Sequence, residues 1–328
     1  MTKKRILSGM RPTGRLHIGH LSVLENWIRY QSEYECYYMV ADWHALTTAY
    51  DETEGIEQSA REMVVDWLAA GMDPGQCAIF QQSRVPQHGE LFLRFAMITP
   101  LGWLERVPTY KDQLDSFRDQ GKDIRTYGFL GYPLLQSADI LVYQAHAVPV
   151  GEDQLPHIEM TREIARRFNH LYGAPVFPEP QGLVGKTALL PGTDGRKMSK
   201  SYGNEIPIGA SDEEIWTKVQ TMVTDPARIR KDDPGHPEVC VVFAYHRIYN
   251  EGEDAEIAGD CRAGRVGCFA CKKRLAECLS SLLAPIRERR EQLLQDPGRI
   301  RDVLEDGNER ATRRAGQTLE EVRRAMKI

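Results

Sequence analysis

Residues 5–31, RILSGMRPTGRLHIGHLSVLENWIRYQ, decide the fold. Arg5 to Ser8 predict a strand and Gly19 to Gln31 predict an amphipathic helix, so that Pro12 to His20 form the turn between them. At such a turn, free backbone N–H groups and the positive end of the helix dipole favour an anion. Glycine at position 19 lets a nucleotide approach the backbone closely. The stretch therefore predicts a phosphate-handling turn within an α/β fold.

Two imidazoles stand in this turn, at His17 and His20. Each can offer a directed donor to a phosphate, yet two histidines taken alone are more often groups that cap or satisfy a turn. The choice between these two roles depends on the rest of the sequence.

Strand and helix patterns continue to alternate beyond the turn. Cys36 to Ala41 and Ala78 to Gln82 predict strands. Ile56 to Ala70 predict a helix, because apolar residues recur at helical spacing and Gly71 fits a C-terminal cap. This alternation is typical of an α/β fold.

The remaining chain changes character twice. Residues 84–130 are less regular and rich in charge, which suits an insertion, and Tyr132 to Tyr172 carry a second block of strand and helix. A Pro/Gly-rich stretch, Gly173 to Gly195, then breaks the pattern, and helical periodicity dominates afterwards. A chain of 328 residues tends to divide into domains. We expect a catalytic domain at 1–195 with its insertion near 84–130, a helical domain at 196–295 and C-terminal helices at 296–328.

Composition excludes several classes of protein. The chain is 41% hydrophobic and 27% charged, which is close to soluble globular proteins and disfavours disordered and membrane classes. Its net charge of -5 gives no overall basic field, so any nucleic-acid contact must come from local patches. The basic N-terminus lacks the apolar run of a signal peptide, and seven cysteines fit poorly with a disulfide framework. We expect a cytoplasmic protein without a membrane segment.

A second chemical signal is the run Lys197-Met198-Ser199-Lys200-Ser201, which follows a glycine-rich turn. Such a run is usually a solvated surface loop. Paired with the histidine turn, its two ammonium groups could instead stabilise the negative charge that grows as pyrophosphate leaves an α-phosphate.

A third signal is the helix expected to begin at Tyr132. Tyr132, Gln136 and Asp139 fall on one face at offsets of four and seven residues, so their polar groups could line one pocket or face solvent. The surrounding apolar residues indicate a mostly buried helix, where unpaired polar groups are costly. We therefore expect a ligand role for this face.

The turn Gly151 to Gln154 precedes another expected helix, Leu155 to Phe168. A strand-to-helix junction again suits a nucleotide. The alternative is that Asp153 is an ordinary N-cap.

Four cysteines, Cys240, Cys261, Cys268 and Cys271, form a possible metal site with twenty, six and two intervening residues. Four thiolates suffice for a structural zinc or for an iron-sulfur cluster. Asn250 to Gly259 is expected to be a loop between two of them. Cys278 is a rival ligand, but it sits in an apolar helical stripe and is expected in the core, as are Cys36 and Cys77.

The runs HIGH at 17–20 and KMSKS at 197–201 resemble the two signatures of class I aminoacyl-tRNA synthetases. This resemblance implies a Rossmann-type parallel-sheet catalytic domain, ATP with Mg²⁺, and attack of an amino-acid carboxylate on the α-phosphate. Arg11, His17 and His20 stand where many bacterial relatives carry Gln, Thr and Asn.

Among these enzymes the sequence most resembles the bacterial tryptophanyl members, through Asp139 and the segments 41–45 and 148–154. Their aspartate accepts the indole N–H, which only donates. Tyrosyl members share the Tyr, Gln and Asp arrangement but usually carry a tyrosine where this chain has Leu7. Tyrosyl enzymes, a small nucleotidyltransferase and a regulatory paralogue binding the adenylate or RNA stay as alternatives.

The resemblance implies the following site residues: catalytic His17, His20, Lys197 and Lys200; ATP-binding Arg11, Pro12, Thr13, Gly19, His20, Gly151, Glu152, Asp153, Lys197, Met198, Ser199, Lys200 and Ser201; tryptophan-binding Tyr132, Gln136, Asp139 and Gln154. It also implies a homodimer whose helical part reads the anticodon of tRNA(Trp). The cysteine spacing resembles a subset of tryptophanyl enzymes that hold a [4Fe-4S] cluster, with a structural zinc as the alternative.

Overall fold

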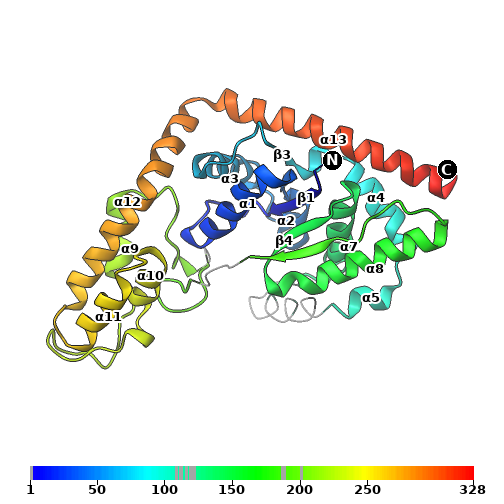
Figure 1. Ribbon diagram of the computed structural model, residues 1–328. Coiled ribbons are helices and arrows are strands. Elements are labelled where there is room, and N and C mark those ends of the chain that lie inside the picture. The colour runs from blue at the N-terminus through cyan, green and yellow to red at the C-terminus, as the bar shows by residue number, and fades with distance from the viewer. Residues whose placement is uncertain are drawn as a thin grey trace.

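A five-stranded parallel sheet lies at the centre of the computed structural model of the protein (Figure 1). The structure describes residues 3–107, 123–185, 190–199 and 202–328, together with Tyr110, Leu114 and Phe117. The strands follow the order β3-β2-β1-β4-β5, all in parallel. Their bounds are Arg5–Met10 (β1), Glu35–Val40 (β2), Cys77–Gln81 (β3), Ala147–Val150 (β4) and Gln181–Val184 (β5). The expected α/β class is confirmed. Strand β5 was not predicted, because it lies within the Pro/Gly-rich stretch Gly173 to Gly195.

Both faces of the sheet are covered, because alternate residues along each strand enter different apolar clusters. Ile6 and Tyr38 belong to one cluster, whereas Leu7 and Tyr37 belong to the other. The first cluster continues into the helical part of the chain through Leu275 and its neighbours. The sheet and the helical part therefore share one continuous core.

Helices connect the strands as the sequence predicted, with shifted ends. They are α1 (Leu21–Glu33), α2 (Asp42–Ala49), α3 (Ile56–Ala70), α4 (Gln87–Ala96), α5 (Leu101–Glu105), α7 (Tyr127–Val142) and α8 (Leu155–Tyr172). The prediction for α3 is confirmed, including Gly71 as its left-handed cap at φ 112°. The expectation that α7 begins at Tyr132 is wrong. The helix begins a turn earlier, where Thr126 Oγ1 accepts a hydrogen bond from Phe129 N, and it continues through Pro133.

Beyond β5, the regular elements in the described part of the chain are helices, which irregular segments separate. The α-helices among them are α9 (Asp212–Gln220), α10 (Val241–Tyr249), α11 (Asp254–Arg262), α12 (Cys268–Gln295) and α13 (Pro297–Met326). The loop expected at Asn250 to Gly259 is shorter than predicted, because α11 already begins at Asp254. No helix in the described part of the chain is long and apolar enough to span a membrane.

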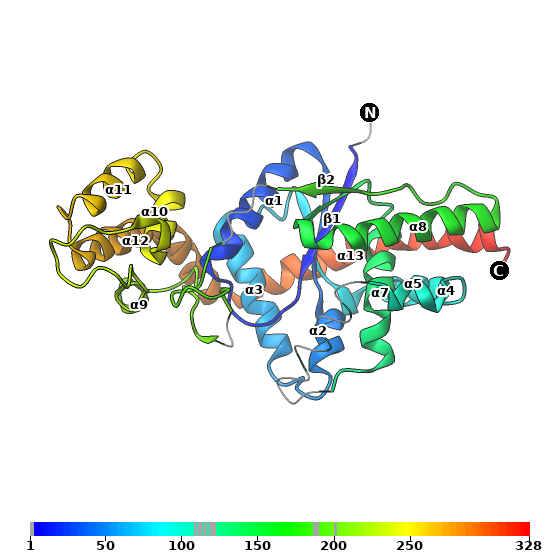
Figure 2. The same cartoon turned by 90° about the horizontal axis from the view of Figure 1, so that it is seen from below.

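One helix, α13, runs back along the catalytic part and carries the C-terminus to its far side (Figures 1 and 2). It packs against β3 so closely that a Cβ on Gly307 would lie 1.8 Å from the carbonyl oxygen of Ile79. Beside this contact, Asn308 Oδ1 accepts a hydrogen bond from the backbone N–H of Gln81 at 2.9 Å. Glycine at position 307 therefore allows the helix to seat on the edge strand.

Candidate active site

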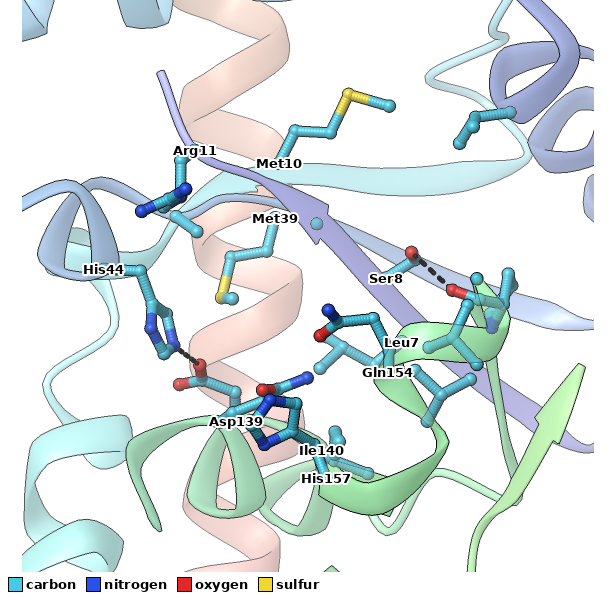
Figure 3. A pocket seen from close by; sticks show the side chains of 18 of the residues that line it. Leu7, Ser8, Met10, Arg11, Met39, His44, Asp139, Ile140, Gln154 and His157 are labelled. Carbon is cyan, nitrogen blue, oxygen red and sulfur yellow. Dashed lines mark hydrogen bonds and ion pairs between the residues drawn. The ribbon is translucent and has the colours of Figure 1, made fainter. Parts of the chain in front are cut away.

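A cavity of about 610 Å³ opens at the carboxyl ends of the central strands (Figure 3). In parallel sheets, ligands bind at this edge where the strand order reverses, here between β1 and β4. The cavity brings together eight of the residues predicted from sequence: Arg11, His20, Tyr132, Gln136, Asp139, Gly151, Asp153 and Gln154. Side chains far apart in the sequence thus converge on one site.

Asp139 lies in the cavity wall with its carboxylate almost fully buried, at 1% exposure. His44 Nε2 lies 2.7 Å from Oδ2, and His88 Nδ1 lies 2.6 Å from Oδ1. Gln82 Nε2 donates to both oxygens, at 2.9 and 3.0 Å. Four different elements, α2, η2 (Gln82–Arg84), α4 and α7, therefore hold one carboxylate in place.

This network fixes the charge of the carboxylate as well as its position. Burial disfavours ionisation, but hydrogen bonds from His44 and His88 and the attraction of His88 outweigh it and hold the pKa of Asp139 at about 2. Behind His88, its Nε2 lies 2.8 Å from the hydroxyl of Tyr143, whose pKa is raised by burial and by the charge of Asp139. Asp139 is therefore a permanently ionised acceptor at neutral pH.

The polar face of α7 points into the cavity as the sequence predicted. Tyr132, Gln136 and Asp139 all line it. The hydroxyl of Tyr132 lies 3.3 Å from Nε2 of His157, a residue of α8 that also lines the cavity. Figure 3 shows Gln154 across the cavity from Asp139, with its amide turned toward the open space. The cavity thus offers polar groups on two sides of an otherwise largely apolar space.

The histidine turn is held by the segment that follows the Lys/Ser loop. Ile18 N donates to Ile206 O at 2.8 Å, and Ile208 N donates to Leu16 O at 3.0 Å. Within the turn, the backbone N–H of His17 donates to Nδ1 of His20 at 3.2 Å. His20 therefore helps to close the turn, in addition to lining the cavity.

The Lys/Ser loop, residues 197–201, also lies beside the histidine turn through its described residue Met198. A Cβ on Gly19 would lie 3.6 Å from Sδ of Met198, which is buried, and Ser199 N donates to Asn204 Oδ1 at 2.8 Å. Lys197 is exposed. Lys200 and Ser201 lie outside the described residues. The two signature segments are thus neighbours. Eight of the described residues predicted for the site are not among those that line the cavity: Pro12, Thr13, His17, Gly19, Glu152, Lys197, Met198 and Ser199.

The turn at Gly151 does not use Asp153 as a helix cap. Gly151 itself is the N-cap of the short turn η3 (Glu152–Gln154), and Gln154 is the N-cap of α8. Asp153 is therefore not an N-cap, and its carboxylate accepts a hydrogen bond from Gln154 Nε2 at 2.8 Å. A Cβ on Gly151 would lie 2.6 Å from Asp153 Oδ1, so glycine is needed for this close approach.

The four predicted cysteine ligands gather at one end of the helical part. Cys240 precedes α10, Cys261 lies on α11, and Cys268 and Cys271 lie in the first turn of α12. Burial, together with the charges of the other three thiols, raises the pKa of Cys271 to about 12. A guanidinium nitrogen of Arg228 lies 3.8 and 4.0 Å from the sulfurs of Cys261 and Cys268.

Arg228 thus places a positive charge beside two of the four thiols. Within the described ranges, which include all four cysteines, no group of three or more His, Cys, Asp or Glu side chains is arranged to hold a metal ion. Cys278 is only partly buried, and its thiol donates to the carbonyl of Tyr249 at 3.3 Å, whereas Cys36 and Cys77 are buried as expected. The expectation that Cys278 lies in the core is therefore wrong, although Leu275 and Leu279 on the same helix are fully buried.

Sequence reasoning missed the side chains that surround Asp139. His44 lies in a segment used only for its resemblance to tryptophanyl enzymes, and Gln82 and His88 were not singled out. A buried acceptor such as Asp139 requires donors. The predicted burial of α7 was therefore the one signal that could have prompted a search for these residues.

Several known proteins are similar to this chain in sequence and in fold. The family model for class I tRNA synthetases (W and Y) matches residues 2–284. The chain is 51% identical to the tryptophan–tRNA ligase of Thermotoga maritima, with 99% of each chain covered. It is 45% identical to that of Aquifex aeolicus, covering 99% of this chain and 100% of the relative. The crystal structure of tryptophanyl-tRNA synthetase from Campylobacter jejuni, complexed with ADP and tryptophan, has a TM-score of 0.88 at 30% identity, and the match covers 99% of this chain and 100% of that one.

Proposed function

The chain belongs to the class I tRNA synthetases of the tryptophan and tyrosine type, and we propose that Asp139 selects its amino acid by accepting the indole N–H of tryptophan. The activity is that of a tryptophan–tRNA ligase, because relatives with that name align with nearly the whole chain. Such an enzyme forms tryptophanyl-adenylate from tryptophan and ATP, with release of pyrophosphate. It then transfers the tryptophanyl group to tRNA(Trp). The enzyme class expected from the sequence is thereby confirmed.

The single observation that carries the proposed selection is the ionised, buried carboxylate of Asp139 in the cavity wall. Indole is a donor only, and a carboxylate without its proton is an acceptor only, so the two groups match. Tyrosine could also donate to it, but no tyrosine hydroxyl comes from position 7, where Leu7 lines the cavity.

The opposite end of the cavity suits ATP. The backbone of the Leu16–His20 turn, with Arg11 and His20 facing the cavity, would hold the phosphates, and Asp153 beside Gly151 would hold the ribose. Lys197 and Lys200 would stabilise the charge that develops on the departing pyrophosphate. Mg²⁺ bound with ATP would neutralise phosphate charge. The tryptophan carboxylate then attacks the α-phosphate in line, and pyrophosphate leaves.

Exchange of labelled pyrophosphate into ATP tests this function, run with tryptophan, with tyrosine and with no amino acid. We expect exchange with tryptophan alone. Asp139→Ala should weaken tryptophan use at least several-fold, because an unpaired buried partner costs on the order of 1–3 kcal/mol, while the KM for ATP stays nearly unchanged. Equal exchange with tyrosine would reject the selection proposed for Asp139.

We also propose that Cys240, Cys261, Cys268 and Cys271 hold a [4Fe-4S] cluster. The shared location of the four thiols and the cation of Arg228 beside two of them support this proposal. The cluster would brace the helical part and takes no part in adenylate formation. Protein purified without oxygen should contain iron and sulfide, which Cys268→Ser removes and Cys278→Ser retains. Zinc in place of iron would overturn the cluster and leave the ligase activity untouched.

Three further expectations belong to the same proposal. A homodimer is supported by the exposed apolar side chains of Leu93, Met97 and Leu101 on α4 and α5, which a second copy would cover. Recognition of the tRNA(Trp) anticodon is proposed for the helical part. The cytoplasm is proposed for the compartment, because the seven cysteines, all within the described residues, form no disulfide. Sedimentation of the purified protein measures the first, and a single-copy mass would reject it.

A further inference from the structure

Behind the histidine turn, one buried carboxylate joins the turn to the helical part of the chain. Asp66 belongs to α3 and is 1% exposed. Its Oδ2 accepts a hydrogen bond from the backbone N–H of Leu16 at 3.0 Å, and its Oδ1 accepts one from Nε of Arg290 at 2.8 Å. Leu16 directly precedes His17, and Arg290 lies on α12. One carboxylate oxygen of Asp66 therefore binds the histidine turn, and the other binds the helical part of the chain.

The surrounding contacts make this connection stiff. Arg290 also lies 3.5 Å from Glu62 Oε2 and is only 13% exposed. A Cβ on Gly209 would lie 2.7 Å from Cδ of Arg290, and the Gly209 carbonyl accepts a hydrogen bond from Arg15 at 3.3 Å. The arginine is therefore enclosed between α3 and the segment that also pairs with the histidine turn.

The energetics favour keeping both partners. Burial raises the pKa of Asp66, while the Leu16 amide and Arg290 oppose that rise. Removal of either donor would leave a buried carboxylate with one oxygen unpaired. Removal of the Asp66 carboxylate would take away the side-chain acceptor of the Leu16 backbone N–H.

We propose that Asp66 and Arg290 are positioning residues that fix the orientation of the ATP-binding turn from the helical part. The proposal rests on the proposed role of Leu16–His20 in holding ATP. Asp66 touches no substrate in this account and acts through the backbone of Leu16. A shift of the turn by about 1 Å would reduce the rate on the order of 10- to 100-fold.

The test compares two adjacent arginines of α12 by tryptophan-dependent pyrophosphate exchange. Arg290→Met should lower kcat/KM for ATP about tenfold. Tryptophan affinity, measured by calorimetry, should stay within about twofold, because the donors that hold Asp139 include neither Asp66 nor Arg290. Arg289→Met is the matched control, since Arg289 Nε contacts the same helix through Ala69 O at 2.5 Å but does not touch Asp66. This control should retain its kcat/KM for ATP.

Three additional variants separate positioning from a loss of stability. Arg290→Lys keeps the charge and should recover part of the kcat/KM for ATP. Asp66→Asn keeps the side-chain volume and should match Arg290→Met, while the double variant should be no worse than either single one, because the two residues act as one unit.

Each result has one meaning. Equal kcat/KM values for Arg290→Met and Arg289→Met would overturn the positioning role, as would a parallel loss of tryptophan affinity. If Arg290→Met does not fold, Asp66→Asn decides by the same comparison. If the unaltered protein shows no tryptophan-dependent exchange, the proposed function itself fails, which is a separate result from equal variants in an active protein.

Discussion

The two ends of the cavity differ in how their functional groups are held. At the tryptophan end, the Asp139 carboxylate is 1% exposed and is fixed by donors from three other elements. At the phosphate end, Lys197 is exposed, and the loop is anchored by Met198 and by the contact of Ser199 with Asn204. The proposed tryptophan site is thus built before the substrate arrives, whereas Lys197 of the Lys/Ser loop is exposed to solvent.

This difference follows from what each end must do. A site that distinguishes tryptophan from other amino acids gains from a buried acceptor, because a ligand without a matching donor leaves that acceptor unpaired. A site that stabilises departing pyrophosphate needs charge that acts mainly in the transition state. Changes at the phosphate end should therefore affect the rate of reaction, and changes at the tryptophan end should affect affinity and selectivity.

The largest expected effect is at the phosphate end. Lys200→Ala should slow adenylate formation on the order of 100-fold, while tryptophan affinity stays within about twofold, because the lysine is needed when pyrophosphate departs. Single-turnover formation of the adenylate and calorimetry with tryptophan measure the two quantities. Lys197→Ala should show a similar but smaller change. An unchanged single-turnover rate would remove Lys200 from the mechanism.

A second effect concerns acid stability at the tryptophan end. The pKa of Asp139 is about 2 in the folded protein, against a usual value of 3.8. The carboxylate thus favours folding at neutral pH by a free energy on the order of 2 kcal/mol. Its stabilisation is complete above the unfolded pKa and is lost as the pH falls from about 4 toward 2.

Urea unfolding of Asp139→Asn beside the unaltered protein measures this contribution. The difference in free energy of unfolding should stay constant from pH 7 to pH 5 and shrink below pH 4. A difference that already shrinks between pH 7 and pH 5 would contradict an ionised, network-held carboxylate.

The smallest effect should come from one donor of the network. Gln82→Met removes the amide that donates to both oxygens of Asp139 and should raise the KM for tryptophan about fivefold, since one hydrogen bond contributes about 1 kcal/mol. Gln81→Met is the matched control, because its amide donates to Asp42 at 2.7 Å instead. Equal KM values for the two variants would show that Gln82 does not support the site.

The sequence predicted the fold best where one local pattern decided the structure. The apolar periodicity of Ile56 to Ala70 and the cap at Gly71 were sufficient for α3, and the shared face of Tyr132, Gln136 and Asp139 was sufficient to place them in one cavity. The start of α7 was placed at Tyr132, whereas the helix begins at Tyr127 with Thr126 as its cap.

Other features could not be read from local patterns, because they depend on contacts between distant segments. His44 and His88 meet Asp139 across 95 and 51 residues of sequence. Arg290 meets Asp66 across 224 residues, and nothing in the charged run around Arg290 separates this residue from its solvated neighbours. Such long-range polar pairs appear only when the packed elements are known.

The most direct test of tryptophan selection compares tryptophan with its benzothiophene analogue, which has the same shape but carries sulfur in place of the indole N–H. The measured quantity is the ratio of kcat/KM for the two amino acids in pyrophosphate exchange, for the unaltered protein and for Asp139→Ala. We predict a preference for tryptophan on the order of 10-fold or more in the unaltered protein, because the analogue has no N–H to donate to the carboxylate, and a ratio near one in the variant. An equal preference in both proteins would contradict Asp139 as the acceptor of the indole N–H.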